Sequence, residues 1–256
     1  MVKWFGGLFL AAYGLAVMAA QEVRVGAYHF PPYVIAPGQA ESTGLLPSLL
    51  EELNRIQDDY RFVLVPTSSA RRYRDFEQGR FELIFFEAPN WGWQDTAFEM
   101  VDMHLEDSEL FVARVEAGRD LSYFDNLRDK RLALLHGYHY AFADFNSDPH
   151  FLAANYRAEL SHSVDNNLRL VLHGRADIAL VTGSYLRDFL RRNPEHAGAL
   201  LVSRRIDQVY RHRALLSPAA SLNRGQLEQL LQRIRATGSQ QRLFSPFDIR
   251  LMPLDD

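Results

Sequence analysis

Few residues of this 256-residue chain combine the type and the spacing that covalent chemistry requires. Cysteine is absent, which excludes a thiolate nucleophile, a thiolate metal site and a disulfide framework. Three histidines lack the spacing of zinc ligands, namely His162, His173 and His196. Glu87 with His139 or His104 would be the candidates for acid–base catalysis, but no triad spacing supports them. We therefore expect a protein without catalytic residues or a cofactor.

Aromatic residues cluster instead in a short loop that could hold a small molecule. The segment "GAYHFPPYV" at 26–34 places four aromatic rings beside two prolines, directly after an apolar, strand-like run. Because proline fixes the backbone, these rings would lose little conformational entropy on contact with a ligand. Tyr28 and Phe30 are candidate ligand contacts, although some of these rings could simply cover a core. The expected structural residues are Pro31, Pro32 and Tyr33.

A second aromatic segment follows the apolar run 81–86. Trp91 and Trp93 flank a glycine, and together with Tyr28 they could form a wall that suits a ring or a cation. Glu87 ends the same apolar run and is a candidate for a ligand contact or a hinge contact.

Polar candidates come from two further loops. Arg71 and Arg72 follow "PTSS" and could face a ligand, with solvent exposure as the alternative for adjacent arginines at a helix start. "GYHY" at 137–140 precedes a predicted helix, whose free backbone N–H groups would favour an anionic ligand atom. Tyr138 and His139 are the candidate contacts in this loop.

Strands and helices alternate along the chain. Strand patterns are predicted at 23–26, 61–66 and 81–86, separated by helix patterns at 45–56 and 71–78. The alternation restarts after residue 110 and ends in an amphipathic helix at 222–234. This order predicts two α/β units, with the chain returning to the first unit near its end. The net charge of −4 gives no reason to expect nucleic-acid binding.

The first twenty residues have the composition of an export signal. Lys3 is followed by an apolar run from Trp4 to Val17 and then by small residues, with cleavage expected after Ala19 or Ala20. The alternative is an uncleaved membrane anchor, but the apolar run is shorter than the roughly 20 residues of a membrane span. A cleaved signal peptide at 1–20 and a periplasmic location are therefore expected.

Seven segments, in order, resemble the family 3 bacterial extracellular solute-binding proteins, the periplasmic receptors typified by amino-acid uptake. They cover essentially the whole chain after the signal: "VRVGAYHFPPYV", "GLLPSLLEELNRI", "FEQGRFELIFF", "LEDSELFVAR", "LRDKRLALLHGYHY", "LRLVLHGRADIALVTG" and "LNRGQLEQLLQRIRATGSQQRLF".

The resemblance implies a two-lobe type II periplasmic-binding fold, each lobe a doubly wound mixed sheet flanked by helices, with a two-strand hinge. Lobe one would comprise 22–108 plus 209–256, and lobe two 109–208. A monomer would capture a small ligand in the interlobe cleft and present it to an ABC permease or a sensor kinase. Cleft binding also agrees with the general rule that α/β sheets bind ligands beyond the carboxyl ends of their strands.

The resemblance also implies which residues should grip an amino acid, and this chain departs from that pattern. Receptors of the family use a lobe-one arginine for the carboxylate and a lobe-two acid for the ammonium group. Here Trp93 is near the arginine position and Thr182 is at the acid position. An indole cannot pair a carboxylate, so a small polar or aromatic solute is expected in place of a standard amino acid. The alternatives are a cyclohexadienyl-dehydratase-like enzyme and a sensory or interaction module with a vestigial cleft.

Overall fold

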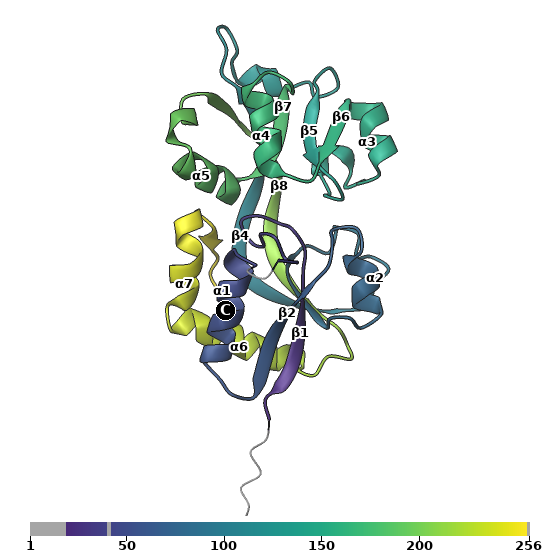
Figure 1. The fold of residues 1–256 in the computed structure, drawn as a ribbon, viewed down its shortest axis with the longest axis vertical. Coiled ribbons are helices and arrows are strands. Elements are labelled where there is room, and N and C mark those ends of the chain that lie inside the picture. The colour runs from purple at the N-terminus through teal and green to yellow at the C-terminus, as the bar shows by residue number, and fades with distance from the viewer. Residues whose placement is uncertain (1–18, 40–41, 255–256) are drawn as a thin grey trace, which may run out of the picture.

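Two lobes joined by two long strands make up the part of the chain that the computed structural model describes, residues 19–39 and 42–254. The joining strands, β4 (Glu99–Arg114) and β8 (Leu200–Leu216), pair in antiparallel fashion over most of their length (Figure 1). This arrangement confirms the predicted α/β class with two lobes and a two-strand hinge. Apart from its last two residues, the predicted signal peptide lies outside the described residues.

Lobe one contains the beginning and the end of the chain. Its elements are β1 (Gln21–Ala27), β2 (Tyr60–Pro66), β3 (Leu83–Glu87), α1 (Leu45–Arg55), α2 (Arg72–Glu77), α6 (Arg224–Ala236) and α7 (Ser239–Phe244). Strand β1 lies between β2 and β3 and is parallel to both. Helix α1 forms because its leucines recur at helical spacing, which gives it one apolar face to bury against the sheet.

Lobe two is the middle of the chain. Its elements are β5 (Leu132–Leu135), β6 (Ala158–Ser161), β7 (Ile178–Thr182), α3 (Pro149–Tyr156), α4 (Val164–Leu172) and α5 (Gly183–Arg192). Strands β5 and β7 are buried along their whole length, as expected for strands covered on both faces. Two apolar clusters lie on opposite faces of this sheet, whereas lobe one has one large cluster.

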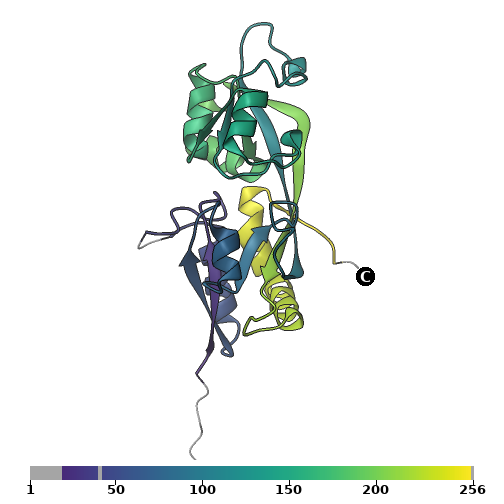
Figure 2. The ribbon, with the colours of Figure 1, turned by 90° about the vertical axis from the view of Figure 1, so that its right-hand side faces the viewer.

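The strands of both lobes belong to one curled sheet with the order β2-β1-β3-β8-β4-β7-β5-β6. A short strand, β9 (Arg250–Leu251), pairs with β4. Seen from the side, the hinge strands run along one edge of the molecule, so the lobes face each other beside them (Figure 2). The predicted lobe boundaries, 108/109 and 208/209, fall inside β4 and β8. None of the described helices has the length and apolar character of a membrane span.

Candidate functional site

A small cavity lies where the two lobes meet beside the hinge. Its lining comes from lobe one, lobe two and the hinge strand β8: Tyr28, Phe30, Arg72, Trp91, Gly137, Tyr138, His139 and Tyr210. The cavity measures about 10 Å³, which is at the lower limit for a single water molecule. The cleft is therefore closed in this structure and filled by its own side chains.

Aromatic rings from three parts of the chain make the wall of this cavity. Tyr28 and Phe30 follow β1 and stack in parallel, with ring centres 5.9 Å apart. Phe30 meets the edge of Trp91 at 5.9 Å and the edge of Tyr138, from lobe two, at 5.6 Å. Tyr210 of β8 completes the wall against Trp91 at 4.8 Å. The expected aromatic site thus includes Tyr28, Phe30 and Trp91, and it continues across the cleft.

Arg72, and not Arg71, is the arginine at the cavity. Arg71 is exposed and donates its Nε to Ser68 on the surface. Arg72 begins α2, where the helical turn directs its side chain inward, and it is only 1% exposed. Its guanidinium donates to the backbone carbonyls of Ser69 and Trp91. The choice between two adjacent arginines depends on the rotation of α2, which the sequence pattern did not resolve.

Glu87 is the charged partner of Arg72. Glu87 Oε1 lies 3.1 Å from Arg72 Nε, and Glu87 is completely buried at the end of β3. Burial raises the pKa of Glu87 above its ordinary value, although the Arg72 guanidinium and the indole of Trp93 oppose the rise. Because an arginine keeps its proton in proteins, the buried guanidinium requires a nearby anion, and Glu87 supplies it.

Four of the predicted site residues do not line the cavity: Arg71, described above, and Glu87, Trp93 and Thr182. Glu87 lies behind Arg72. Trp93 is completely buried in lobe one, where its indole donates to Glu87 over 2.8 Å and its ring packs on Tyr73 and Phe76. Thr182 caps α5, because its hydroxyl accepts the backbone N–H of Tyr185.

The two lobes are connected at the cavity by hydrogen bonds between protein groups. The hydroxyl of Ser69 in lobe one donates to the carbonyl of His136 in lobe two over 3.1 Å. The hydroxyl of Tyr138 in lobe two donates to the carbonyl of His29 in lobe one over 3.0 Å. These bonds connect the two lobes directly.

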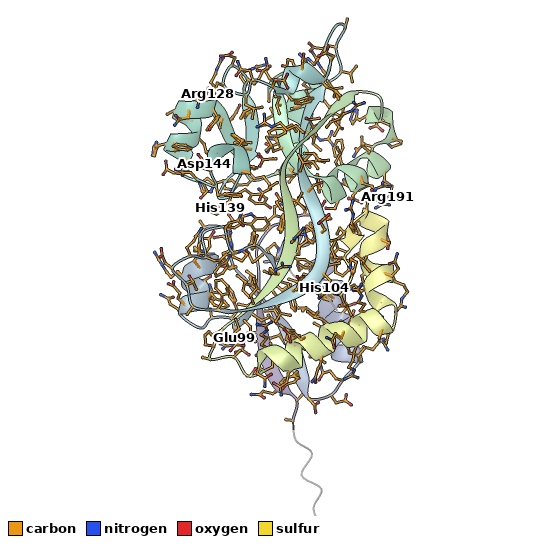
Figure 3. The ribbon with its side chains drawn as sticks, turned by 180° about the vertical axis from the view of Figure 1, so that it is seen from behind. Glu99, His104, Arg128, His139, Asp144 and Arg191 are labelled. Atoms are coloured by element: carbon orange, nitrogen blue, oxygen red, sulfur yellow. The ribbon has the colours of Figure 1, made fainter. Side chains whose placement is uncertain are left out.

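Gln208 of β8 links the two sides of the cleft. Its amide nitrogen donates to the carbonyl of His139 over 2.6 Å, and its amide oxygen accepts the indole N–H of Trp91 over 3.0 Å. His139 lies between the lobes (Figure 3). Burial, together with the Arg72 cation, lowers the pKa of His139 to about 4, so this ring is neutral at pH 7. Sequence reasoning missed Gln208 and Tyr210, because no recognisable motif marks their segment.

A buried polar network crosses the hinge behind the aromatic wall. Tyr33 in lobe one donates to Asp107 of β4 over 2.8 Å, and Ser184 at the start of α5 donates to the same carboxylate over 2.5 Å. His212 of β8 lies 2.7 Å from the Tyr33 hydroxyl. Burial lowers the pKa of His212 to about 3, so its imidazole is neutral. The network ties α5 of lobe two to the hinge and to lobe one.

A larger hollow of about 680 Å³ lies on the other face of the hinge strands. Val209 contributes to it, whereas its neighbour Tyr210 points into the aromatic cavity, as alternation along a strand requires. Arg187 of α5 pairs with Asp248 near the C-terminus across this hollow, which is called the rear groove below. Figure 3 shows this face, with Arg191 of α5 above α7.

His104, one of the residues considered for acid–base chemistry, lies away from the cavity. Its Nδ1 is 3.0 Å from the carbonyl of Pro253, near the C-terminus. Among residues 19–39 and 42–254, no group of three or more histidine, aspartate or glutamate side chains could hold a metal ion. The charged pair at the cavity is thus Arg72 with Glu87, and the remaining lining is aromatic or neutral.

Several solved structures share this architecture. A mutant of ArgBP from T. maritima superposes with a TM-score of 0.66 at 15% identity, over 89% of this chain and 95% of that one. A histidine kinase sensor domain with similarity to periplasmic binding proteins gives 0.66 at 16%, over 92% and 99%. An ancestral amino-acid-binding protein, a precursor of cyclohexadienyl dehydratase, gives 0.63 at 14%, over 88% and 94%.

No protein-family model and no curated protein matches the chain in sequence. The structural likeness shows the fold, which is the type II periplasmic-binding-protein fold.

Proposed function

We propose that this chain is an exported solute-binding protein of the family 3 type. As a monomer in the periplasm, it would capture a small polar or aromatic solute between its lobes and present it to an ABC permease or a membrane sensor. The observation that carries this proposal is the convergence of both lobes and the hinge on one aromatic cavity. Residues from all three parts move relative to one another when a hinge bends, so a ligand held there would couple binding to closure.

The ligand would bind by opening and reclosing the cleft. The present cavity of about 10 Å³ has no room for a solute, so the lobes must separate before one enters. The ligand would then replace contacts that Tyr138 and His139 now make with lobe one. Of the nine predicted contacts, Tyr28, Phe30, Trp91, Tyr138 and His139 line the cavity, which supports them as ligand contacts.

A thermal-shift screen of a few hundred small solutes tests the proposal. A ligand at 100 times its Kd stabilises a folded protein by about 2.7 kcal/mol, so a physiological solute should raise the melting temperature by several degrees. Scattering measurements with the hit should show a compact, closed molecule. If no solute in the panel shifts the melting temperature, the cleft is vestigial and the interaction-module alternative is favoured.

A sensory role is the second candidate, because one structure of the same fold is a histidine kinase sensor domain. The direct hydrogen bonds between the lobes also suit a module that reports its conformation to a partner. A third possibility is an enzyme on this scaffold, for which the dehydratase precursor gives the precedent. Conversion of the screening hit to a product would favour the enzyme over both binding roles.

A further inference from the structure

The guanidinium of Arg72 already has several partners within the protein. Its nitrogens donate to the carbonyls of Ser69 and Trp91, and Glu87 lies 3.1 Å from Nε. Its flat faces are covered by the rings of Tyr28 at 4.8 Å and Tyr73 at 4.3 Å. A ligand carboxylate would therefore have to compete with these resident groups, above all with Glu87, for this arginine.

The resident anion is held firmly in place. Glu87 is completely buried, and Trp93 donates to Oε2 over 2.8 Å. The register between β3 and β8 shifts between Ile84 and Glu87, and Phe86 within that shift has φ of 63°. Glu87 belongs to the same chain as Arg72, so their pairing costs no translational entropy, whereas the binding of a free carboxylate does cost translational entropy. Displacing Glu87 would also leave a buried carboxylate without its cation, which is strongly unfavourable.

The rest of the cavity offers no second charge. Besides Arg72 and a glycine, its lining consists of the rings of Tyr28, Phe30, Trp91, Tyr138 and Tyr210 and of the imidazole of His139. That imidazole is neutral at pH 7 because burial lowers its pKa to about 4. Aromatic faces bind flat rings, and the hydroxyl and imidazole groups can orient them through hydrogen bonds.

We propose that Glu87 keeps Arg72 in an internal ion pair. The cleft therefore binds uncharged aromatic solutes and does not bind aromatic solutes with a free carboxylate. This proposal rests on solute capture as the function and names the class of solute. It assigns Glu87 as a positioning residue that sets specificity from behind the cavity.

The test compares benzoate with benzamide, which differ in charge but share a ring. The melting temperature would be measured at increasing concentrations of each compound. The proteins are the full mature chain, the variant Glu87→Gln and the control Glu82→Gln. Glu82 precedes the other end of β3 and also lies 3.1 Å from an arginine, Arg24, but outside the cavity. We expect benzoate to bind Glu87→Gln at least tenfold more tightly than the wild type, with Glu82→Gln unchanged.

Two results would overturn the proposal. In the first, Glu87→Gln folds but does not bind benzoate more tightly than the wild type; in the second, aromatic carboxylates stabilise the wild type in the solute screen. If Glu87→Gln does not fold, the wild-type screen decides: stabilisation only by uncharged aromatic solutes supports the proposal, and stabilisation by carboxylates contradicts it. Failure of solute capture itself looks different. In that case neither probe nor any solute shifts the melting temperature of either protein.

Discussion

Tyr138 in lobe two donates its phenolic hydrogen to the backbone carbonyl of His29 in lobe one, with 3.0 Å between the two oxygens. The ring of the same tyrosine lies edge-on against Phe30 of lobe one, at 5.6 Å. One side chain therefore connects the lobes through both a hydrogen bond and a ring contact. The balance between closed and open molecules should respond directly to changes at this residue.

Tyr138→Phe should shift that balance toward the open form. The substitution keeps the ring contact and removes the hydrogen bond, which contributes about 1 kcal/mol, so the open-to-closed ratio should rise about fivefold. Since the chain has no cysteine, one introduced in α3 and one in α6 can carry dyes for single-molecule energy transfer. The matched control is Tyr156→Phe, which loses a bond of 2.9 Å within lobe two and should leave the ratio unchanged. Equal ratios in both variants would contradict the role given to Tyr138.

Gly137→Ala should also open the molecule, for a steric reason. An added Cβ at Gly137 would lie 2.7 Å from the hydroxyl oxygen of Ser69 in the opposite lobe, and the residue has φ of 75°. Gly118 has nearly the same φ, 77°, but its added Cβ meets no atom within 4 Å. Both alanine variants should lose roughly 1–2 kcal/mol of stability from backbone strain. Only Gly137→Ala should show separated lobes in small-angle scattering; an identical radius of gyration would refute the interlobe contact.

Replacing one member of the buried Arg72–Glu87 pair should lower the free energy of unfolding more than replacing both members. Arg72→Met should lower the free energy of unfolding by about 3–5 kcal/mol, because Glu87 would remain buried without its cation. The double variant Arg72→Met with Glu87→Met should recover much of that loss, since apolar groups can replace both charges. Urea unfolding of the two single variants and the double variant provides the complete cycle. Additive losses would mean that the two side chains do not interact.

His212 should make the fold sensitive to acid. Its pKa is about 3 in the folded protein against an ordinary value of 6.5. Between these values the unfolded chain binds a proton that the folded chain does not, so stability is lost as the pH falls from 6.5 toward 3. His212→Gln should reduce the loss between pH 7 and pH 4 by about 3 kcal/mol, at about 1.4 kcal/mol for each pKa unit.

The comparison with wild type is essential for this measurement. Burial raises the pKa of Asp107 and Glu109, and their protonation in acid has the opposite effect on stability. These carboxyls are present in both proteins, so their effect cancels in the difference. His150→Gln, at an exposed position on α3, is the control and should follow the wild type. Parallel pH profiles for His212→Gln and wild type would exclude the assignment.

The fold could be predicted because its signals are repeated along the chain. Leucines at helical spacing in α1 and apolar runs in β3 and β7 each specify an element by burial alone. The order of these elements then restricts the topology to an α/β arrangement of two units. The continuity of the sheet through both lobes could not be predicted, because it depends on the pairing of β4 with β8, about 100 residues apart.

The site could be predicted only in part. Tyr28, Phe30 and Trp91 were identifiable because exposed rings on rigid loops are costly unless they have a function. Trp93 has the same local sequence signal as Trp91, but the turn at Gly92 directs it into the core of lobe one. Arg72 and Gln208 become recognisable only when helix rotation and strand alternation assign a direction to each side chain.

The rear groove and the aromatic cavity lie on opposite faces of the same pair of strands. When these two strands bend so that the aromatic cavity opens, α5 must approach the C-terminal segment on the opposite face, and the rear groove becomes narrower. The Arg187–Asp248 pair spans that gap. A bulky group attached in the rear groove would prevent this narrowing and would therefore keep the aromatic cavity closed, whichever solute is present.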